Sequence, residues 1–348
     1  AGIAAGDIVV YADYIGGVVP DAKLYALKVM PDNSGSTNGD QITAAIDWCV
    51  SHQFDDPNNP ILVISMSLGG GDYMGTCDWA VPSFTDAVAA ANAAGITVLA
   101  SSGNDGFCDS MGFPACVRNV ISVGAVFDGY LGSLGFCLNQ WSCIGEVNPT
   151  YCAEPSKFYG SSTSPLQVAP YSNSFEIVDL LAPSNNAYTT DIKGIFGSSV
   201  GDYYGAMGGT SAACPYAAGA AAAIQQAAMD ILNRPLTPAE LKDTLTQSGS
   251  PIIDFKNNIT TPLVNIADAV DSLDIFNGTE FTVFNDNDFP ILIYQVQSPQ
   301  WLTVFPDAGN YGIFLDAGES KQFRAMAYCT NCNYEDLTGE VVFTTTDG

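Results

Sequence analysis

Basic residues are scarce in this sequence of 348 residues. It holds 10 lysines and arginines against 37 aspartates and glutamates, which gives a formal net charge of −27. Such a surface repels phosphate backbones and anionic lipid, so we expect no nucleic acid and no membrane partner. A solvated acidic surface explains the carboxylates. Clustered carboxylates that bind structural calcium are the alternative, although the sequence places no such cluster.

Long uncharged apolar runs are also missing. None reaches the roughly 18–20 residues of a membrane span. The alanine-rich run 217–228 is too short and contains Gln225 and Gln226. The chain opens on AGIAAGDIVV, without the basic segment of a signal peptide. A hydrophobic content of 47% with 14% charged residues nevertheless indicates a globular protein with a sizeable core.

Histidine is almost absent, because His52 is the single one. No zinc site built on clustered histidines is therefore expected. His52 follows the helix-like segment AIDWCVS, and we interpret it as a surface or helix-terminal residue.

Cysteine, by contrast, is frequent, with ten residues. Six fall in one stretch rich in Gly, Pro, Asn and Ser: Cys77, Cys108, Cys116, Cys137, Cys143 and Cys152. This pattern favours disulfides and a secreted protein. Cys108 and Cys116 could close a small loop, but Cys77 competes for either, so the pairing stays open. We expect a local disulfide at Cys329 and Cys332, and buried thiols at Cys49 and Cys214.

Apolar strand-like runs alternate with helix-like runs over residues 1–272. The strand-like runs are 23–29, 61–68, 96–103, 119–126 and 176–183, and the helix-like runs are 39–52, 81–95, 211–230 and 236–249. This alternation predicts an α/β domain with a parallel, doubly wound sheet and helices on both faces. Residues 128–170 break the pattern and predict a disulfide-tied excursion. Thr237 and Glu240 predict a capping box.

The pattern changes in residues 273–348. Short alternating or apolar runs separated by turn residues predict a small β-sandwich as a second domain. Its last run continues to Gly348, which suggests that this module is cut short. The segment SPQWLTVFPDAG (298–309) is similar to immunoglobulin-like sandwiches that follow secreted enzymes.

The stretch GGTSAACPYAAGAAAAI (208–224) has the composition of a turn and helix that could position a nucleophilic serine. Gly208 and Gly209 permit a sharp turn, and Ser211 then lies near a helix N-terminus, whose dipole favours developing negative charge. The small residues that follow allow the helix to pack deeply. Taken alone, the string also fits a capping serine on a buried helix, and this alternative stays open.

Three sequence segments together favour the interpretation of Ser211 as a nucleophile over that of a capping serine. GTSAACPYAAGAAA resembles the nucleophile motif of subtilisin-like serine proteases. ISMSLGGG (64–71) resembles the strand that pairs with the substrate, and LASSGNDG (99–106) the segment with the oxyanion asparagine. The resemblance covers residues 1–272 and implies a subtilisin-like fold.

The resemblance also implies roles. Ser211 would form an acyl-enzyme, while Asn104 and the Ser211 N–H would hold the oxyanion. Residues expected to bind an extended protein or peptide substrate form two walls, Ser67, Leu68 and Gly69 on one side and Ser101, Ser102 and Gly103 on the other. If Gly112 closes the pocket floor, a large apolar P1 side chain fits. No cofactor is required, structural calcium is possible, and we expect a monomer.

The catalytic histidine and aspartate have no match in these residues. By resemblance the histidine would lie about five positions before Ala1, and the aspartate further upstream. A non-catalytic histidine of the motif is Tyr216 here. We therefore expect an incomplete piece of a secreted serine endopeptidase. It should be poorly stable and inert, with a gap in the sheet between runs 23–29 and 61–68. The alternative is a non-catalytic peptide-binding or adhesive protein on the same scaffold.

Overall fold

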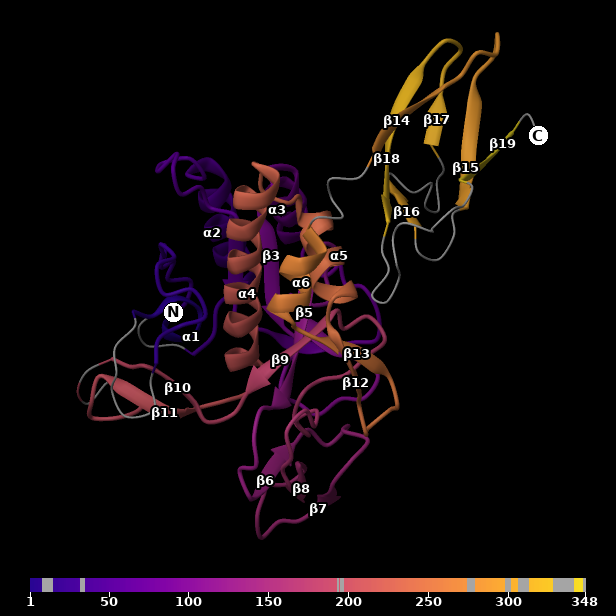
Figure 1. Cartoon of the computed structure of the whole chain (residues 1–348). Helices are drawn as coiled ribbons and strands as arrows, with labels where there is room; N and C mark the ends of the chain where they lie inside the picture. The colour runs from indigo at the N-terminus through magenta and orange to yellow at the C-terminus, as the bar shows by residue number, and fades with distance from the viewer. Residues whose placement is uncertain are drawn as a thin grey trace. The chain divides into compact units, whose positions relative to one another are not determined.

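The structure is a computed structural model of the chain (Figure 1). It describes residues 1–7, 15–31, 35–192, 194, 197–273, 279–297, 302–305, 313–327 and 341–346. The chain divides into two compact units. One comprises residues 1–229 and 234–270, and the other comprises 230–233 and 271–348.

A six-stranded sheet forms the centre of the first unit. Its order is β1-β3-β5-β9-β13-β12, with bounds Val63–Met66, Thr97–Ser101, Val120–Phe127, Leu180–Ser184, Thr260–Leu263 and Ser250–Ile253. Strands β1, β3, β5, β9 and β13 run parallel, and β12 is antiparallel to β13. The predicted parallel sheet is therefore confirmed.

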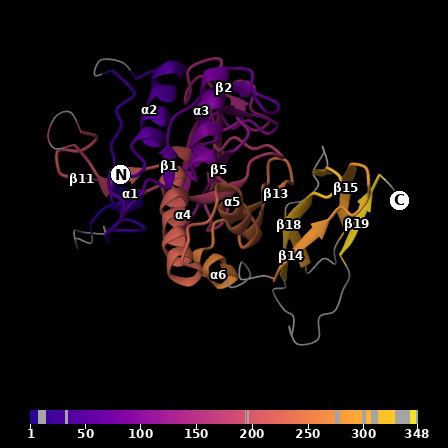
Figure 2. The same cartoon turned by 90° about the horizontal axis from the view of Figure 1, so that it is seen from above.

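Helices cover both faces of this sheet, as predicted (Figures 1 and 2). On one face lie α2 (Gly39–Ser51) and α3 (Pro82–Ala93), and on the other α4 (Thr210–Leu232), α5 (Pro238–Gln247) and α6 (Ile266–Asp271). The Asn38 side chain caps α2, and Thr237 forms the predicted capping box with Glu240 at the start of α5. The core beneath α2 and α3 joins Ile46, Phe84 and Val98.

The strand-like run 61–68 forms a strand that is shorter than predicted and partly exposed. Only Val63–Met66 forms β1, and only Met66 of these four residues is buried. All five residues of β3 are buried. The difference arises because β3 has a neighbour on each side, whereas β1 pairs with β3 alone among the described strands.

The prediction of a strand at 23–29 is wrong. These residues have no assigned strand, and Leu24 and Tyr25 are exposed. A strand needs a neighbour for its backbone groups, and no described strand pairs with this run. Side chains hold it instead, through the Lys23–Asp56 ion pair and the contact of the Tyr25 ring with Trp48.

The predicted excursion after β5 is a small antiparallel sheet of order β6-β8-β7, with bounds Ser133–Leu138, Lys157–Ser162 and Glu146–Val147. Three disulfides join cysteines of the described residues: Cys77–Cys116, Cys108–Cys143 and Cys137–Cys152. Cys77 therefore takes Cys116, and the loop 108–116 is not closed on itself. Cys49 and Cys214 are buried free thiols, as predicted. Cys329 and Cys332 lie outside the described residues.

Three shorter pieces complete the first unit. Helix α1 (Gly2–Ala5) lies against the hairpin of β10 (Ala187–Thr190) and β11 (Tyr203–Met207). Strands β2 (Gly70–Tyr73) and β4 (Met111–Phe113) form an antiparallel pair. None of the described helices is both long and apolar enough to cross a lipid bilayer.

Two three-stranded antiparallel sheets make up the second unit. Their orders are β14-β18-β16 and β17-β15-β19, with bounds Thr279–Phe284, Ser320–Ala327, Leu302–Phe305, Ile313–Leu315, Ile291–Gln297 and Val342–Thr345. Both sheets contribute to one apolar core that contains Ile291, Ile293, Leu315 and Phe323. The immunoglobulin-like character of this sandwich stays a prediction, as does the boundary at residue 272.

Candidate active site

Gly208 and Gly209 form the turn that connects β11 to α4. Gly209 has a φ of +79°, and a Cβ on it would lie 3.2 Å from both side-chain heteroatoms of Asn104. The Ser184 hydroxyl donates to the Gly209 carbonyl at 2.8 Å and fixes the turn. The left-handed backbone favours glycine here, and a larger residue would also push against the Asn104 amide.

Ser211 is the second residue of α4 and is half-buried. Neither its hydroxyl nor its backbone N–H makes a hydrogen bond to any residue in the described part of the chain. The N–H is one of the donors that every helix N-terminus leaves without an intrahelical acceptor. Both groups are thus available to a ligand.

The Ser211 carbonyl accepts a hydrogen bond from the residue that follows β1. Pro215 lies four residues further along α4 and has no N–H, so it cannot donate to this carbonyl. The Ser67 hydroxyl donates to it instead, at 2.8 Å. Cys214 adds a second tie to β1, because its sulfur lies 3.5 Å from the Ser65 hydroxyl and 3.6 Å from the Met66 carbonyl.

Thr210 connects Ser211 to the loop after β3. Its N–H and hydroxyl both donate to Asn104 Oδ1, at 2.8 and 2.9 Å, and its hydroxyl accepts from the Gly103 N–H at 3.3 Å. Because both donors fix Oδ1, the Asn104 Nδ2 group is left as the free donor, with no acceptor among the described residues. The place of Thr210 in the motif is the sequence signal for this residue, but the sequence alone does not indicate these hydrogen bonds.

The two predicted walls come together at the carboxyl ends of β1 and β3. The Ser101 hydroxyl donates to the Leu68 carbonyl at 3.5 Å. The Gly112 N–H donates to the Ser102 carbonyl at 3.0 Å, and a Cβ on Gly112 would lie 3.3 Å from the backbone N and O of Gly70. A Cβ on Gly69 would lie 2.7 Å from the Phe113 carbonyl oxygen. Ser102, however, is fully buried. Its hydroxyl donates to the Asn173 carbonyl at 3.2 Å and its N–H donates to the Val123 carbonyl at 2.9 Å, so Ser102 exposes no surface to a ligand in this structure.

Two ionisable groups on α4 are held in their neutral forms. Burial raises the pKa of the Cys214 thiol to about 11, so it is not a nucleophile near neutral pH. Burial, together with the charge of Asp128, raises the pKa of Tyr216. Tyr216 occupies the position of the motif's second histidine and carries no charge at neutral pH.

His52 lies away from this site, at the end of α2 on the opposite face of the sheet (Figure 2). Its ring stacks on Trp48 with centroids 4.2 Å apart, and its Nδ1 lies 2.9 Å from the Trp48 carbonyl. The interpretation as a helix-terminal histidine is confirmed. The described residues also contain no group of three or more His, Cys, Asp or Glu side chains placed to bind a metal ion.

The sequence model of the subtilase family matches residues 1–268. This match covers most of the chain and coincides with the unit that carries the parallel sheet, the Gly-Thr-Ser turn and the Asn104 loop. The chain therefore belongs to the subtilase family.

Among curated proteins, the chain is 33% identical over 244 residues to the serine protease AprX of Bacillus subtilis, an alignment covering 70% of this chain and 50% of AprX. It is 32% identical over 225 residues to subtilisin E of the same species, covering 63% and 44% of the two chains. The chain thus spans about half the length of these relatives.

Solved structures share the fold. The patellamide maturation protease PatA superimposes with a TM-score of 0.55 at 18% identity, covering 78% of this chain and 82% of PatA. A protease of Pseudoalteromonas arctica gives a TM-score of 0.55 at 22% identity, covering 78% of this chain and 69% of that protease.

Proposed function

We propose that Ser211 is the nucleophile of a serine endopeptidase that cleaves protein or peptide substrates. One observation carries the proposal: the Ser211 hydroxyl and N–H are unbonded, and they stand beside an Asn104 amide whose oxygen is fixed by Thr210. In this reaction Oγ bonds to the scissile carbonyl carbon, and the amine leaves with a proton. Water then hydrolyses the acyl-enzyme. The Asn104 Nδ2 group and the Ser211 N–H donate to the oxyanion meanwhile.

The general base and its aspartate are proposed to come from residues outside these 348. The single histidine lies on the opposite face of the sheet. Ile3 of α1 packs in one cluster with Ala212, the residue after Ser211, so residues that precede α1 would approach the nucleophile. The resemblance places the histidine there. The edge of β1 that has no partner among the described strands would accept the strand that bears the aspartate.

Substrate would bind in extended form. Ser67 and Gly69 are exposed at the end of β1, where their backbone groups can pair with a substrate strand. Ser101 and Gly103 would form the facing wall, with Ser102 buried behind it, and a large apolar P1 side chain would fit if Gly112 closes the pocket floor. Structural calcium remains part of the proposal without an assigned site.

Three disulfides support export to an oxidising compartment. The net charge of −27 supports a protein without nucleic-acid or membrane partners. We propose that the secreted protein acts as a monomer.

The alternative is a non-catalytic peptide-binding or adhesive protein on the subtilase scaffold. It is favoured by one observation: the only histidine of the sequence stacks on Trp48 at the end of α2 and takes no part in the Ser211 site in this structure. It shares the substrate-binding walls but needs no base.

The test compares the 348-residue chain with the complete product of its gene, each as wild type and as Ser211→Ala. We expect the complete product to hydrolyse an apolar-P1 peptide anilide and to bind a fluorophosphonate at Ser211. Ser211→Ala should lose at least about 10³-fold in rate, while the 348-residue chain stays unlabelled.

Each part of the proposal has its own contrary result. Hydrolysis that survives Ser211→Ala contradicts the nucleophile. Labelling of the 348-residue chain as fast as the complete product contradicts an external base. Peptide binding without any labelling of the complete product supports the alternative.

A further inference from the structure

One buried amide holds the loop that carries Asn104. Asn173 lies between β5 and β9 and is 1% exposed. Its Nδ2 group donates to the Ser102 carbonyl at 3.1 Å. Its Oδ1 accepts from the N–H groups of Asp105 at 2.9 Å and Phe107 at 3.2 Å. The amide therefore fixes the chain on both sides of Asn104.

The backbone of residues 173 and 174 is hydrogen-bonded to the same loop. The Asn173 N–H donates to the Gly103 carbonyl at 3.0 Å, and the Ser174 N–H donates to the Phe107 carbonyl at 2.9 Å. Gly103 has a φ of +111°, and a Cβ on it would lie 2.3 Å from Asn173 Nδ2. The loop is thus shaped around this amide, which a side chain at position 103 would displace.

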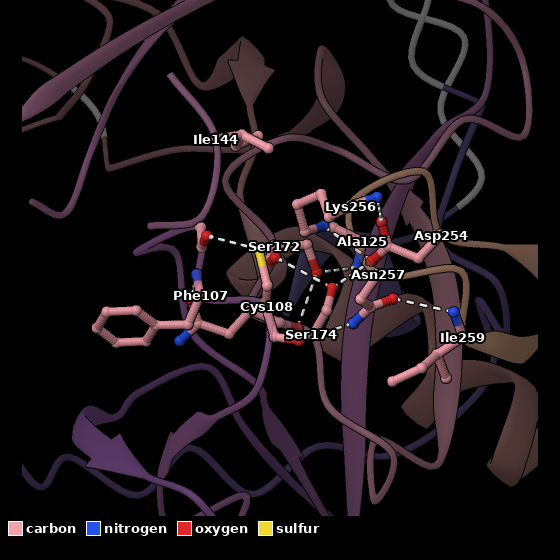
Figure 3. A network of polar contacts seen from close by, with 12 residues as sticks. Phe107, Cys108, Ala125, Ile144, Ser172, Ser174, Asp254, Lys256, Asn257 and Ile259 are labelled. Atoms are coloured by element: carbon pink, nitrogen blue, oxygen red, sulfur yellow. Dashed lines mark hydrogen bonds and ion pairs between the residues drawn. The ribbon is translucent and has the colours of Figure 1, made fainter. Parts of the chain in front are cut away.

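A buried polar network also contacts the end of the Asn104 loop and the residue after Asn173 (Figure 3). The Ser174 hydroxyl donates to the Asp254 carboxylate, which pairs with Lys256 at 2.9 Å. Both charged side chains are nearly inaccessible, at 5% and 0% exposed. Asn257 then donates to the Cys108 carbonyl at 2.8 Å, at the far end of the loop. The turn between β12 and β13 therefore holds both the loop and the residue that follows Asn173.

We infer that Asn173 is a positioning residue for the oxyanion site, because its side-chain amide fixes residues 102–107 and so presents Asn104 Nδ2 beside Ser211. Asn173 itself touches no substrate. The inference rests on the proposed function of Ser211 and Asn104, but the order of the loop can be measured without any catalytic activity.

The competing role is that of a polar residue that merely stabilises the core. Gln225 offers a matched control for this role. It is 2% exposed, and its amide makes two hydrogen bonds to the backbone of Leu236, at 2.9 and 2.7 Å, in the connection between α4 and α5. Gln225→Leu removes a buried amide of the same kind from a place that does not contact the Asn104 loop.

The experiment measures amide exchange at Asp105 and Phe107, and the Asn104 side-chain NH₂ signal in NMR spectra, in the 348-residue chain. Asn173→Leu should speed exchange at both amides by at least about tenfold and should move or broaden the Asn104 signal. Asn173→Asp keeps the acceptor oxygen and should hold both amides within about twofold of wild type. Gln225→Leu should change neither readout.

The inference is overturned if folded Asn173→Leu keeps both amides protected, or if Gln225→Leu affects them equally. If Asn173→Leu does not fold, the test rests on Asn173→Asp. Loss of protection at the Asp105 and Phe107 amides in that variant would also contradict the inference. In the complete gene product, Asn173→Leu should lower kcat with little change in KM, and Asn173→Asp should restore it. A product whose Ser211 never reacts would refute the proposed function while leaving the exchange results to judge Asn173.

Discussion

Strands β1 and β3 lie side by side and both end at the candidate site, yet they differ in how they are supported. Every residue of β3 is buried, whereas three of the four residues of β1 retain exposed surface. The loop after β3 is held by Thr210, Asn173 and the network behind them. The end of β1 is held chiefly by the Ser67 hydroxyl and by Cys214.

This difference separates two halves of one site. The half that would stabilise an oxyanion is fully built from the described residues. The half along β1 has an open sheet edge, and the run 23–29 near α2 has no strand partner among the described residues. Open edges carry unpaired backbone groups that another strand can satisfy. Under the proposed function, the general base and the strand that would cover this edge come from the same part of the protein.

The largest expected effect compares the two strands directly. Leu99→Ala, in the fully buried β3, should lower the free energy of unfolding by about 3 kcal/mol, because it leaves a cavity. Ile64→Ala in the half-buried β1 should cost about 1 kcal/mol, since its site is partly hydrated. Urea unfolding of both variants measures the gap. Equal losses would mean that β1 is as well supported as β3.

The thiol beneath β1 reports whether that strand stays attached. Since the pKa of Cys214 is raised from 9.0 to about 11, its thiolate fraction at pH 8 should be about a hundredfold below that of an ordinary cysteine. Alkylation by iodoacetamide should be at least that much slower, and should rise with pH up to about 11. Peptide mapping identifies the site. Rapid alkylation at pH 8 would show that β1 detaches.

The glycine before Asn104 should tolerate no side chain. Gly103→Ala combines a positive φ with a clash against Asn173 and should cost about 2 kcal/mol or more. Gly95→Ala is the control, because Gly95 also has a positive φ but no atom within 4 Å of the added Cβ. It should cost about 1 kcal/mol. Thermal or urea unfolding measures both losses of stability. Equal losses would show that the contact with Asn173 does not contribute to the effect of Gly103→Ala.

The smallest effect compares the two hydroxyls that connect α4 to the walls. Thr210→Val keeps the shape but leaves the partly buried Gly103 N–H without its acceptor, which should cost about 1–2 kcal/mol. Ser67→Ala exposes the Ser211 carbonyl to water, which can replace the lost donor, so the cost should be about 0.5 kcal/mol. Urea unfolding of both variants measures the difference, and a larger loss for Ser67→Ala would reverse the comparison.

The sequence predicts the elements whose signals are local. Continuous apolar runs predict β3 and β5, and the Gly-Gly-Thr-Ser string predicts the mount of Ser211. The strand at 23–29 fails because an apolar pattern does not state whether a neighbour is present. The Cys77–Cys116 bond depends on a contact between segments 39 residues apart, where the Cys77 N–H also donates to the Cys116 carbonyl at 2.9 Å, and no local pattern in the sequence marks that contact.

Asn173 is missed for a related reason. Its side-chain partners lie 66 to 71 residues away in the chain, so no periodicity or spacing marks it. Thr210 lies within a recognisable motif, but its hydrogen bonds to Asn104 and Gly103 depend on how α4 docks against the β3 loop. Residues that position others across a fold are visible only once the fold is known.

Amide exchange of β1 and β3, compared between the 348-residue chain and the complete product of its gene, tests the central claim most directly. In the 348-residue chain, β3 and residues 102–107 should be protected, while the β1 amides that face away from β3 exchange at least about tenfold faster. In the complete product these β1 amides should become as protected as those of β3. Equal protection of the two strands in the 348-residue chain would contradict the account.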